Sequence, residues 1–219
     1  YKKVFGFSDY AYSGPETGVK DKTSYVPKKN KVFYVLTTPI LSNHPISDWL
    51  RKHGDGVYDI AFNVDSVEDA YNGCIDRGAE SIDDLVAIND KNGFFSKASI
   101  KSYGDCIHSF INNQKYEIWA PNFIMMDNSI DSEDTKIELI DHVVANVELD
   151  KMDHWKEYYE KIFGFCAFVR FDETDISTKY SSLKSVVLRS KNWKIKLPIN
   201  EPSEGLKKSQ IEEYLDFNE

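Results

Sequence analysis

The sequence predicts an α+β protein that contains two tandem copies of one module. The first observation is an internal repeat: KVFGF at residues 3–7 recurs as KIFGF at residues 161–165. The resemblance continues, and a Lys-Asn pair follows about 26 residues later in the first copy, at residues 29–30, and about 30 residues later in the second, at residues 191–192. The second observation is the order of patterns, because each copy has a strand, then a helix, then several strands. Mixed patterns of this kind, repeated along a chain, indicate a duplicated α+β module.

Helical periodicity predicts one helix in each copy. The first, residues 66–78, begins with a capping box formed by Ser66 and Asp69 and ends at a glycine. The second, residues 151–163, has Asp150 as a candidate cap and is also followed by a glycine. The apolar stripes are Val67, Ala70, Tyr71, Cys74 and Ile75 in the first helix, and Met152, Trp155, Tyr158, Tyr159 and Ile162 in the second.

Strands are predicted where β-branched and aromatic residues gather between Gly, Asn or Asp. Residues 12–24 are rich in Gly, Ser, Thr and Pro, which is typical of a loop. Residues 121–136 are polar and acidic without periodicity, which indicates a linker. The predicted strands are residues 31–37, 57–64, 97–103, 106–112, 138–147, 183–189 and 193–199.

The repeat also predicts domain boundaries and an incomplete chain. We expect a first domain at residues 1–120, the linker at residues 121–136 and part of a second domain at residues 137–219. The second copy begins further upstream of its KIFGF segment than the first copy does, and it stops soon after its match to residues 48–53. We therefore expect an interior piece of a longer protein, with residues missing at both ends.

Composition argues against several classes of partner and location. The formal net charge is −9, and the lysines are scattered among acidic residues, which argues against a nucleic-acid-binding surface. No apolar run approaches the length of a membrane-spanning helix. Three cysteines at long, irregular spacings, Cys74, Cys106 and Cys166, fit a reducing compartment better than a disulfide framework. We expect a cytoplasmic protein.

His142 is the histidine best placed to bind a metal. In the predicted strand 138–147, alternation puts Ile140, His142, Val144 and Asn146 on one face and Asp141 on the other. A neutral imidazole that points into the concavity of a sheet can bind a metal ion. A single histidine in a strand is more often a satisfied core or edge residue, so the strand alone leaves both interpretations open.

A second candidate site is the segment LPINEP at residues 197–202. Two prolines flank Asn200 and fix the direction of its amide, which could bind a substrate carbonyl or carboxylate. The alternative is a turn in which Asn200 bonds its own backbone. Ser185, in the neighbouring strand, has the same ambiguity. The sequence contains no recognisable phosphate loop, nucleophile elbow or zinc-binding cysteine pair.

Taken together, these segments resemble the 4-hydroxyphenylpyruvate dioxygenase family of the vicinal oxygen chelate superfamily over nearly the whole chain. The combination of motifs is far more specific than any one of them. It comprises YSGPETG at residues 12–18, HGDGVYDIAF at 53–62, IDHVVAN at 140–146, YSSLKS at 180–185, LPINEP at 197–202 and KSQI at 208–211.

The resemblance implies two tandem vicinal-oxygen-chelate domains, built from βαβββ modules that form open β-barrels with helices outside. It implies a non-haem iron(II) enzyme that converts 4-hydroxyphenylpyruvate and O2 to homogentisate and CO2, a step of tyrosine breakdown. In this family two His and one Glu of the C-terminal domain bind the iron. His142 matches the first ligand, and the other two would lie beyond Glu219. By register, Asp59 stands in the first copy where the second copy should supply its next His, so the first domain is expected to be metal-free.

The resemblance also implies a substrate pocket and an assembly. Ser185, Asn200 and Gln210 correspond to polar residues of the pocket, and Pro198 corresponds to part of its wall. Chelation of the keto acid would orient it, and these neutral groups would hold it without adding charge near the metal. The family usually forms homo-oligomers, either dimers or tetramers. No catalytic residue is assigned beyond the metal ligand, and no nucleic acid or membrane partner is expected.

Two alternatives stay open at this point. Hydroxymandelate synthase shares fold, metal and substrate but hydroxylates the side-chain carbon, and a metal-free binding or structural paralogue would share only the fold. With one of three iron ligands present, the 219-residue chain alone is not expected to hold iron in a catalytic geometry.

Overall fold

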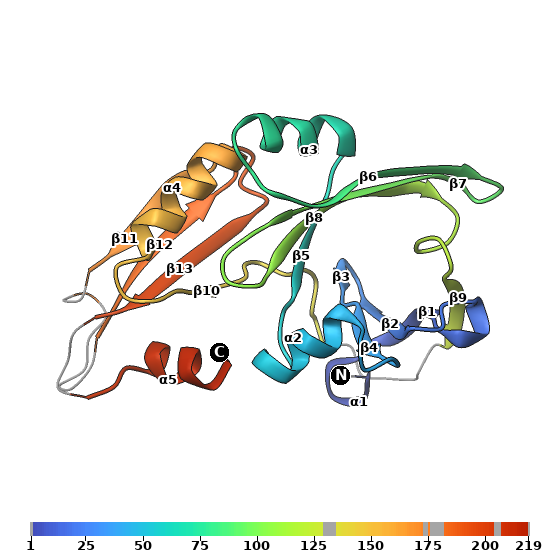
Figure 1. Ribbon diagram of the computed structural model, residues 1–219, viewed down its shortest axis with the longest axis horizontal. Coiled ribbons are helices and arrows are strands. Elements are labelled where there is room, and N and C mark those ends of the chain that lie inside the picture. Colours follow the sequence, from blue (N-terminus) through green and yellow to red (C-terminus); the bar gives the residue numbers. More distant parts are fainter. Residues whose placement is uncertain (1, 129–134, 173–174, 176–181, 204–206, 219) are drawn as a thin grey trace.

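The computed structural model describes residues 2–128, 135–172, 175, 182–203 and 207–218. These residues form three sheets with helices packed beside them, which confirms the α+β class (Figure 1). Within the described residues each sheet is open, since none of the strand orders closes on itself. Residues 180 and 181 of the YSSLKS segment lie outside the described residues.

Sheet 1 has the strand order β3-β2-β1-β9, and β4 also pairs with β2. β9 (Ile124–Asn128) lies in the predicted linker and pairs antiparallel with β1, so this part of residues 121–136 is a strand. The predicted loop 12–24 is shorter than expected, because β1 and β2 occupy its two ends. The other elements of this part are α1 (Lys2–Phe5), β1 (Ser8–Ser13), the 3₁₀ helix η1 (Pro15–Thr17), β2 (Lys22–Lys29), β3 (Val32–Phe33), β4 (Leu36–Pro39) and α2 (Pro45–His53).

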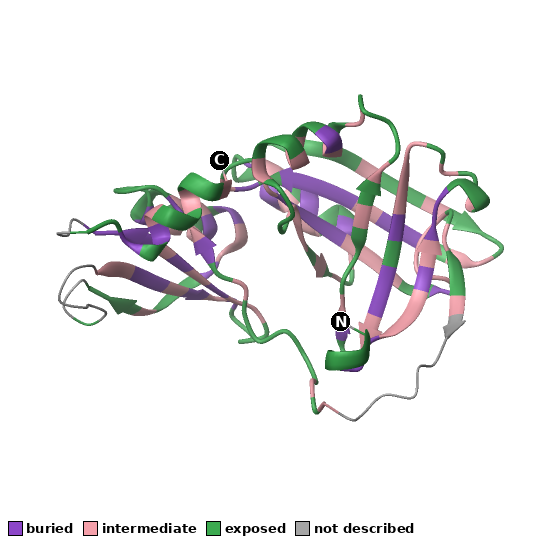
Figure 2. Ribbon diagram, turned by 90° about the horizontal axis from the view of Figure 1, so that it is seen from below, coloured by how far each residue is buried: buried purple, intermediate pink, exposed green. Residues whose placement is uncertain are grey.

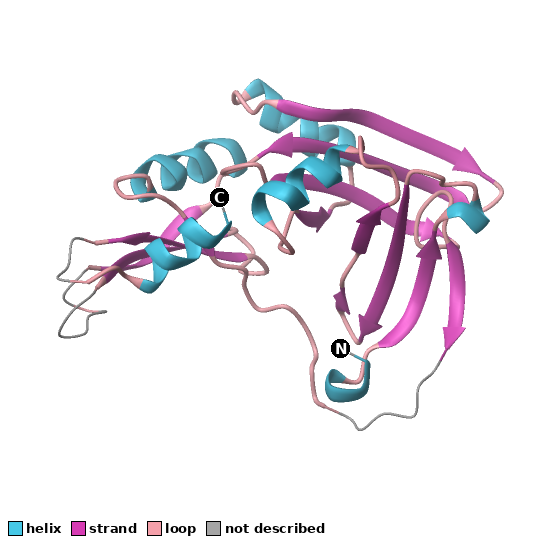
Figure 3. Ribbon diagram, turned by 60° about the horizontal axis from the view of Figure 1, so that its bottom comes forward, coloured by secondary structure: helices cyan, strands magenta, loops and turns pink. Residues whose placement is uncertain are grey.

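Sheets 2 and 3 have the same topology, which Figure 3 lets the reader follow. In each sheet, a helix follows the first strand along the chain. The first strand pairs in parallel with the last strand of the sheet. The orders are β5-β8-β7-β6 in sheet 2 and β10-β13-β12-β11 in sheet 3. Sheet 2 comprises β5 (Asp59–Asn63), α3 (Val67–Asp76), β6 (Ser81–Asp90), β7 (Gly93–Lys101) and β8 (Ile107–Tyr116). Sheet 3 comprises β10 (Ala145–Asn146), α4 (Met152–Phe163), β11 (Cys166–Phe171), β12 (Leu183–Arg189) and β13 (Lys196–Pro202), followed by α5 (Gln210–Asn218).

The repeated sequence corresponds to repeated structure. α1 and α4 each end at a glycine with positive φ, 70° at Gly6 and 66° at Gly164. A buried phenylalanine follows each glycine, Phe7 or Phe165, and leads into the next strand. Only glycine adopts this left-handed conformation without steric cost, which explains why the KVFGF and KIFGF segments share it.

The two predicted helices are present, but one predicted cap is wrong. The Ser66 side chain accepts a hydrogen bond from Asp69 N at 3.2 Å and caps α3 as expected. α4 instead begins after Lys151, and Asp150 has a φ of 62°, which turns the chain before the helix. The buried carboxylate of Glu201 on β13 accepts a hydrogen bond from Met152 N at 3.0 Å. A carboxylate from another strand therefore replaces the local cap of α4.

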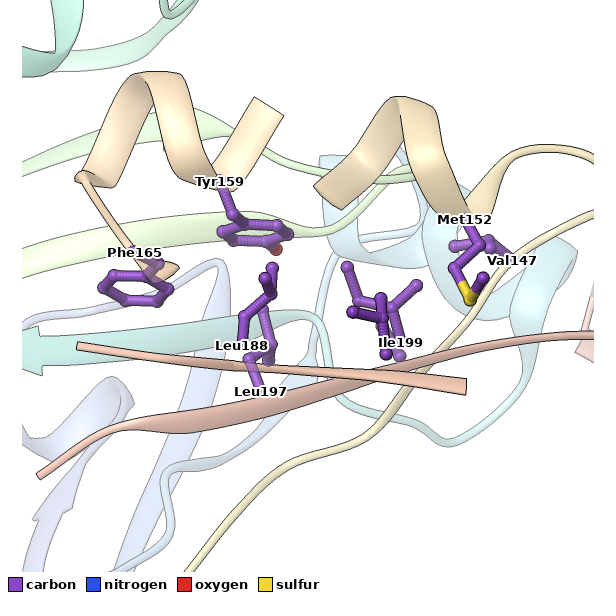
Figure 4. Packing of buried hydrophobic residues seen from close by; sticks show 9 residues of the cluster. Val147, Met152, Tyr159, Phe165, Leu188, Leu197 and Ile199 are labelled. Carbon is purple, nitrogen blue, oxygen red and sulfur yellow. The ribbon is translucent and has the colours of Figure 1, made fainter. Parts of the chain in front are cut away.

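Each of α3 and α4 covers one face of its own sheet. The core under α4 contains Met152, Tyr159, Leu188 and Ile199 (Figure 4), and the core under α3 contains a second set around Tyr71 and Phe110. Ile162 of α4 belongs to the core of α3, so the two helices pack against each other as well. Along β13, from Lys196 to Glu201, half-buried residues alternate with buried ones, and Figure 2 shows buried positions in all three sheets.

A buried polar cluster joins sheet 2 to α4. His108 Nδ1 lies 3.1 Å from the carbonyl oxygen of Ile60, which only accepts, so this nitrogen carries the proton. Nε2 is then the acceptor, and it lies 2.7 Å from the Tyr159 hydroxyl and 3.0 Å from Ser102 Oγ. Ser102 and Tyr159 also hydrogen-bond to each other at 2.9 Å. The three polar side chains satisfy one another in a site that excludes water.

We predict that acid weakens the fold through His108. Burial lowers the pKa of His108 to about 4, whereas histidine in an unfolded chain titrates near 6.5. The unfolded chain therefore binds a proton that the folded chain does not, and the free energy of unfolding falls as pH falls from about 6.5 to about 4. The expected contribution is at most about 3 kcal/mol. Urea unfolding at pH 7 and at pH 4.5 measures it, and the His108→Gln variant should lack this part of the pH dependence. Equal pH slopes in the two proteins would contradict the prediction.

We predict that Glu201→Ala lowers the free energy of unfolding by about 1–2 kcal/mol. The reason is that Met152 N and the Lys184 ammonium, whose Nζ lies 3.5 Å from Glu201 Oε1, lose their buried acceptor. Chemical denaturation measures the loss. Glu157→Ala, on the exposed side of the same helix, is the matched control and should change stability by less than about 0.5 kcal/mol. Equal effects of both substitutions would rule out the capping role.

Candidate functional site

The face of sheet 3 that points away from α4 gathers three of the predicted site residues. Val186, Leu188, Leu197 and Ile199 pack under α4, so the residues between them face the opposite side. Ser185 on β12 lies directly opposite Asn200 on β13. Pro198 is two residues away on the same strand, and Asn200 is paired in the other direction with Asn146 on β10. The structure thus brings Ser185, Pro198 and Asn200 together on one open face.

The polar groups of Ser185, Asn146 and Asn200 are a hydroxyl and two neutral amides, while Arg189 and Lys196 lie further along the same face. Ser185 is buried and Asn200 is half-buried. Asn200 Nδ2 donates to Asn146 Oδ1 at 3.4 Å, so among the described residues the amide contacts a neighbouring strand rather than its own backbone. The alternation in the sequence had placed Asn146 on the face of His142, and the structure gives it a second role beside Asn200. Such groups can bind carbonyl, carboxylate or phenol oxygens through hydrogen bonds.

Gln210 begins α5, which approaches sheet 3 from the side opposite to α4 (Figures 1 and 3). α5 contacts β10 and β13, and its Ile211 is buried. A reciprocal capping box fixes the start of the helix: Glu212 N donates to Ser209 Oγ at 3.2 Å, and Ser209 N donates to Glu212 Oε2 at 2.6 Å. The Gln210 side chain is exposed, on a helix that contacts the strands of Asn146 and Asn200.

His142 lies outside any strand, which corrects the predicted strand 138–147. Only β10, residues 145 and 146, pairs with sheet 3. The preceding residues instead meet the turn between β2 and β3, where Lys31 N donates to the carbonyl oxygen of Glu138 at 3.1 Å. Without strand pairing, alternation no longer separates the side chains of His142 and Asp141. His142 Nδ1 and Asp141 Oδ2 are hydrogen-bonded at 2.8 Å.

Asp141 connects His142 to sheet 3. Lys196 Nζ on β13 donates to Asp141 Oδ1 at 2.6 Å. The Lys196 ammonium, followed by His142, holds the pKa of the Asp141 carboxyl below its usual value. All three side chains are about one-third to two-thirds exposed, so this is a surface network. Beside it, a crevice of about 340 Å³ is lined by Asp141, His142 and a set of apolar side chains that includes Phe7 and Tyr34.

The described side chains around His142 offer one candidate metal ligand, His142 itself, and not a complete metal site. His142 Nε2 makes no hydrogen bond within the described residues, while Nδ1 is directed at a carboxylate, an arrangement typical of metal-binding histidines. The described residues nevertheless contain no group of three His, Cys, Asp or Glu side chains that could hold a metal ion. Any metal bound by His142 must take its other ligands from elsewhere.

Asp59, the residue of the first copy expected where the second copy continues with a His, already has partners. Its carboxylate accepts hydrogen bonds from Ser109 N at 3.1 Å and from Ser109 Oγ at 2.6 Å. Burial raises the pKa of this carboxyl, and these two bonds oppose the shift. The group ties β5 to β8 within sheet 2.

No protein-family model matches the chain. Curated relatives named 4-hydroxyphenylpyruvate dioxygenase match nearly all of it, and three of them serve as examples. These are from Dictyostelium discoideum (40% identical over 224 residues), Yarrowia lipolytica (40% over 229) and Coccidioides posadasii (38% over 235), each match covering 99% of this chain. This chain is a homologue of 4-hydroxyphenylpyruvate dioxygenases. It spans 58% to 61% of the length of these three relatives.

Solved structures agree on the fold. A triple mutant of 4-hydroxymandelate synthase from Streptomyces coelicolor superposes with a TM-score of 0.83 at 21% identity, over 97% of this chain and 60% of that one. A fusion of a xylose isomerase-like TIM barrel with 4-hydroxyphenylpyruvate dioxygenase gives a TM-score of 0.68 at 16% identity, over 91% of this chain and 29% of that one. At these identities the likeness to the dioxygenase and synthase structures concerns fold alone. Within the described residues, no helix combines the length and apolar character needed to cross a membrane.

We predict that Lys196→Met raises the pKa of Asp141 toward its usual value, because the ammonium is the main cause of its depression. Carboxyl NMR titration of the 219-residue chain measures the shift. Lys194→Met removes an equal charge from an exposed position two residues away and should leave Asp141 unchanged. An unaltered Asp141 titration in Lys196→Met would contradict the pairing.

Proposed function

We propose that this chain is part of a 4-hydroxyphenylpyruvate dioxygenase, which converts 4-hydroxyphenylpyruvate and O2 to homogentisate and CO2 in tyrosine and phenylalanine catabolism. The similarity to enzymes of that name, 38% to 40% identical over 99% of the chain, carries the proposal. It is supported by three predicted pocket residues, Ser185, Pro198 and Asn200, which share one face of sheet 3.

The proposed cofactor is Fe(II), with His142 as its ligand in this chain. Iron bound there by two His and one Glu would supply the redox chemistry that activates O2 and would chelate the keto acid. The chain's own contribution is orientation: Asp141 receives the Nδ1 proton of His142, which leaves Nε2 available to the metal. The remaining ligands are proposed to come from the part of the protein that the relatives have and this chain does not.

Ser185, Asn200 and Gln210 are proposed to bind the oxygens of the substrate. Neutral donors on rigid strands hold a substrate in one orientation without competing with the metal for its carboxylate. Pro198, opposite Val187, would form part of the apolar wall against the ring. Asn146 joins this set, since its amide already contacts Asn200.

The proposed organisation is that of two tandem vicinal-oxygen-chelate domains with helices outside open barrels. The first, residues 1–120, would be metal-free, in keeping with the engagement of Asp59 by Ser109. Residues 121–136 would connect it to the catalytic domain, which starts at residue 137. A homo-oligomer, dimer or tetramer, in the cytoplasm is proposed, and three free cysteines support a reducing compartment. The negative net charge argues against a nucleic acid partner, and no membrane partner is proposed.

Hydroxymandelate synthase is the second candidate, favoured by the fold likeness to that enzyme. The curated relatives, at roughly twice the sequence identity, favour the dioxygenase. A metal-free paralogue is the third, since the described residues supply no complete metal site.

The deciding measurement is Fe(II)-dependent O2 uptake by the full-length protein with 4-hydroxyphenylpyruvate, together with identification of the product. We expect homogentisate, and we expect His142→Ala to abolish both iron binding and uptake because a metal ligand is lost. Hydroxymandelate as the product would transfer the assignment to the synthase. An iron-free protein without uptake would establish the paralogue. His44→Ala is the control. It replaces a histidine that is distant in sequence from His142 and caps α2, and this variant should retain iron.

A further inference from the structure

His53, the last residue of α2, contacts two other parts of the chain. Its Nε2 lies 2.8 Å from Asp105 Oδ2, in the turn between β7 and β8. Its Nδ1 is hydrogen-bonded to the carbonyl oxygen of Asn218, the last residue of α5. The His53 side chain is 15% exposed, whereas the Asp105 side chain is 50% exposed. The ends of α2 and α5 meet at this point (Figures 1 and 3).

Both partners of the ring are acceptors. A backbone carbonyl and a carboxylate cannot donate, so His53 satisfies both only when each nitrogen carries a proton. Asp105 is suited to stabilise that charged ring, because Lys52, at 2.8 Å, and His53 hold the pKa of its carboxyl below the usual value. The Trp49 ring, 5.0 Å away, covers another side.

The other end of α5 carries Gln210. The capping box of Ser209 and Glu212 fixes that end, and Ile211 is buried where the helix contacts β10 and β13. A helix of this length is a rigid rod of about 12 Å. Holding its C-terminal carbonyl therefore sets the tilt of the helix and the place of its first residue.

We propose that His53, oriented by Asp105, is a positioning residue for the substrate site. Through α5 it holds Gln210 beside the face of Ser185 and Asn200, so the metal-free first copy shapes the pocket of the second. This inference rests on the proposed function for the role of Gln210, but the clamp on α5 does not.

Hydrogen exchange on the 219-residue chain tests the clamp by itself. His53→Ala should increase the exchange rates of the α5 amides on the order of tenfold and leave those of α4 unchanged, because only α5 loses a contact. Lys52→Ala is the matched control: it removes a cation from the same carboxylate without touching Asn218. Unchanged α5 protection in His53→Ala, or equal loss in Lys52→Ala, would overturn the proposal.

A double-mutant cycle on the full-length iron enzyme tests the link to Gln210. We expect His53→Ala and Gln210→Ala each to raise the KM for 4-hydroxyphenylpyruvate about fivefold with little change in kcat, and the double variant to be no worse than Gln210→Ala. Additive effects, or an unaltered KM in His53→Ala, would overturn it. If the wild-type enzyme shows no dioxygenase activity, the proposed function fails, while the exchange experiment still decides whether His53 clamps α5.

Discussion

The burial of α4 between two sheets is the constraint on which the rest of the structure depends. One stripe of the helix, with Met152 and Tyr159, packs on sheet 3, while Ile162 enters the core beneath α3. The hydroxyl of Tyr159 reaches His108 in sheet 2. A single helix is therefore part of both cores, and the arrangement of the two copies follows from its two buried faces.

Charged and uncharged polar side chains lie in different parts of the structure. At the centre, His108 is kept uncharged, since a buried proton would have no counter-ion and would add a donor where acceptors are needed. Ion pairs such as Lys196 with Asp141 lie at the surface. On sheet 3 the neutral side chains of Ser185 and Asn200 lie opposite each other, the first buried and the second half-buried.

Sequence patterns predicted those parts of the fold whose stability comes from an apolar stripe. The two periodic helices and β12 were predicted correctly. Strands held mainly by backbone pairing were missed or misplaced: β9 lies within the segment predicted to be a polar linker, and residues 138–144 have an alternating pattern but no strand partner among the described residues. Alternation predicts which face a strand would bury, whereas pairing depends on distant residues. The capping of α4 by Glu201 is equally non-local. For the candidate site, the family resemblance named Ser185, Pro198 and Asn200, which the structure brings onto one face, and their role stays a prediction. His53 showed no local signal, because its partners are 52 and 165 residues away.

The adjacency of Asn200 and Glu201 on β13 has a consequence for folding fidelity. Successive residues face opposite sides, so a slip of one position would turn the carboxylate into the neutral pocket and the amide toward the start of α4. The helix would lose its acceptor, and the pocket would gain a negative charge that repels an anionic ligand. One misalignment is thus penalised twice, on both faces of the sheet. Asn200 and Glu201 together therefore favour one register of β13.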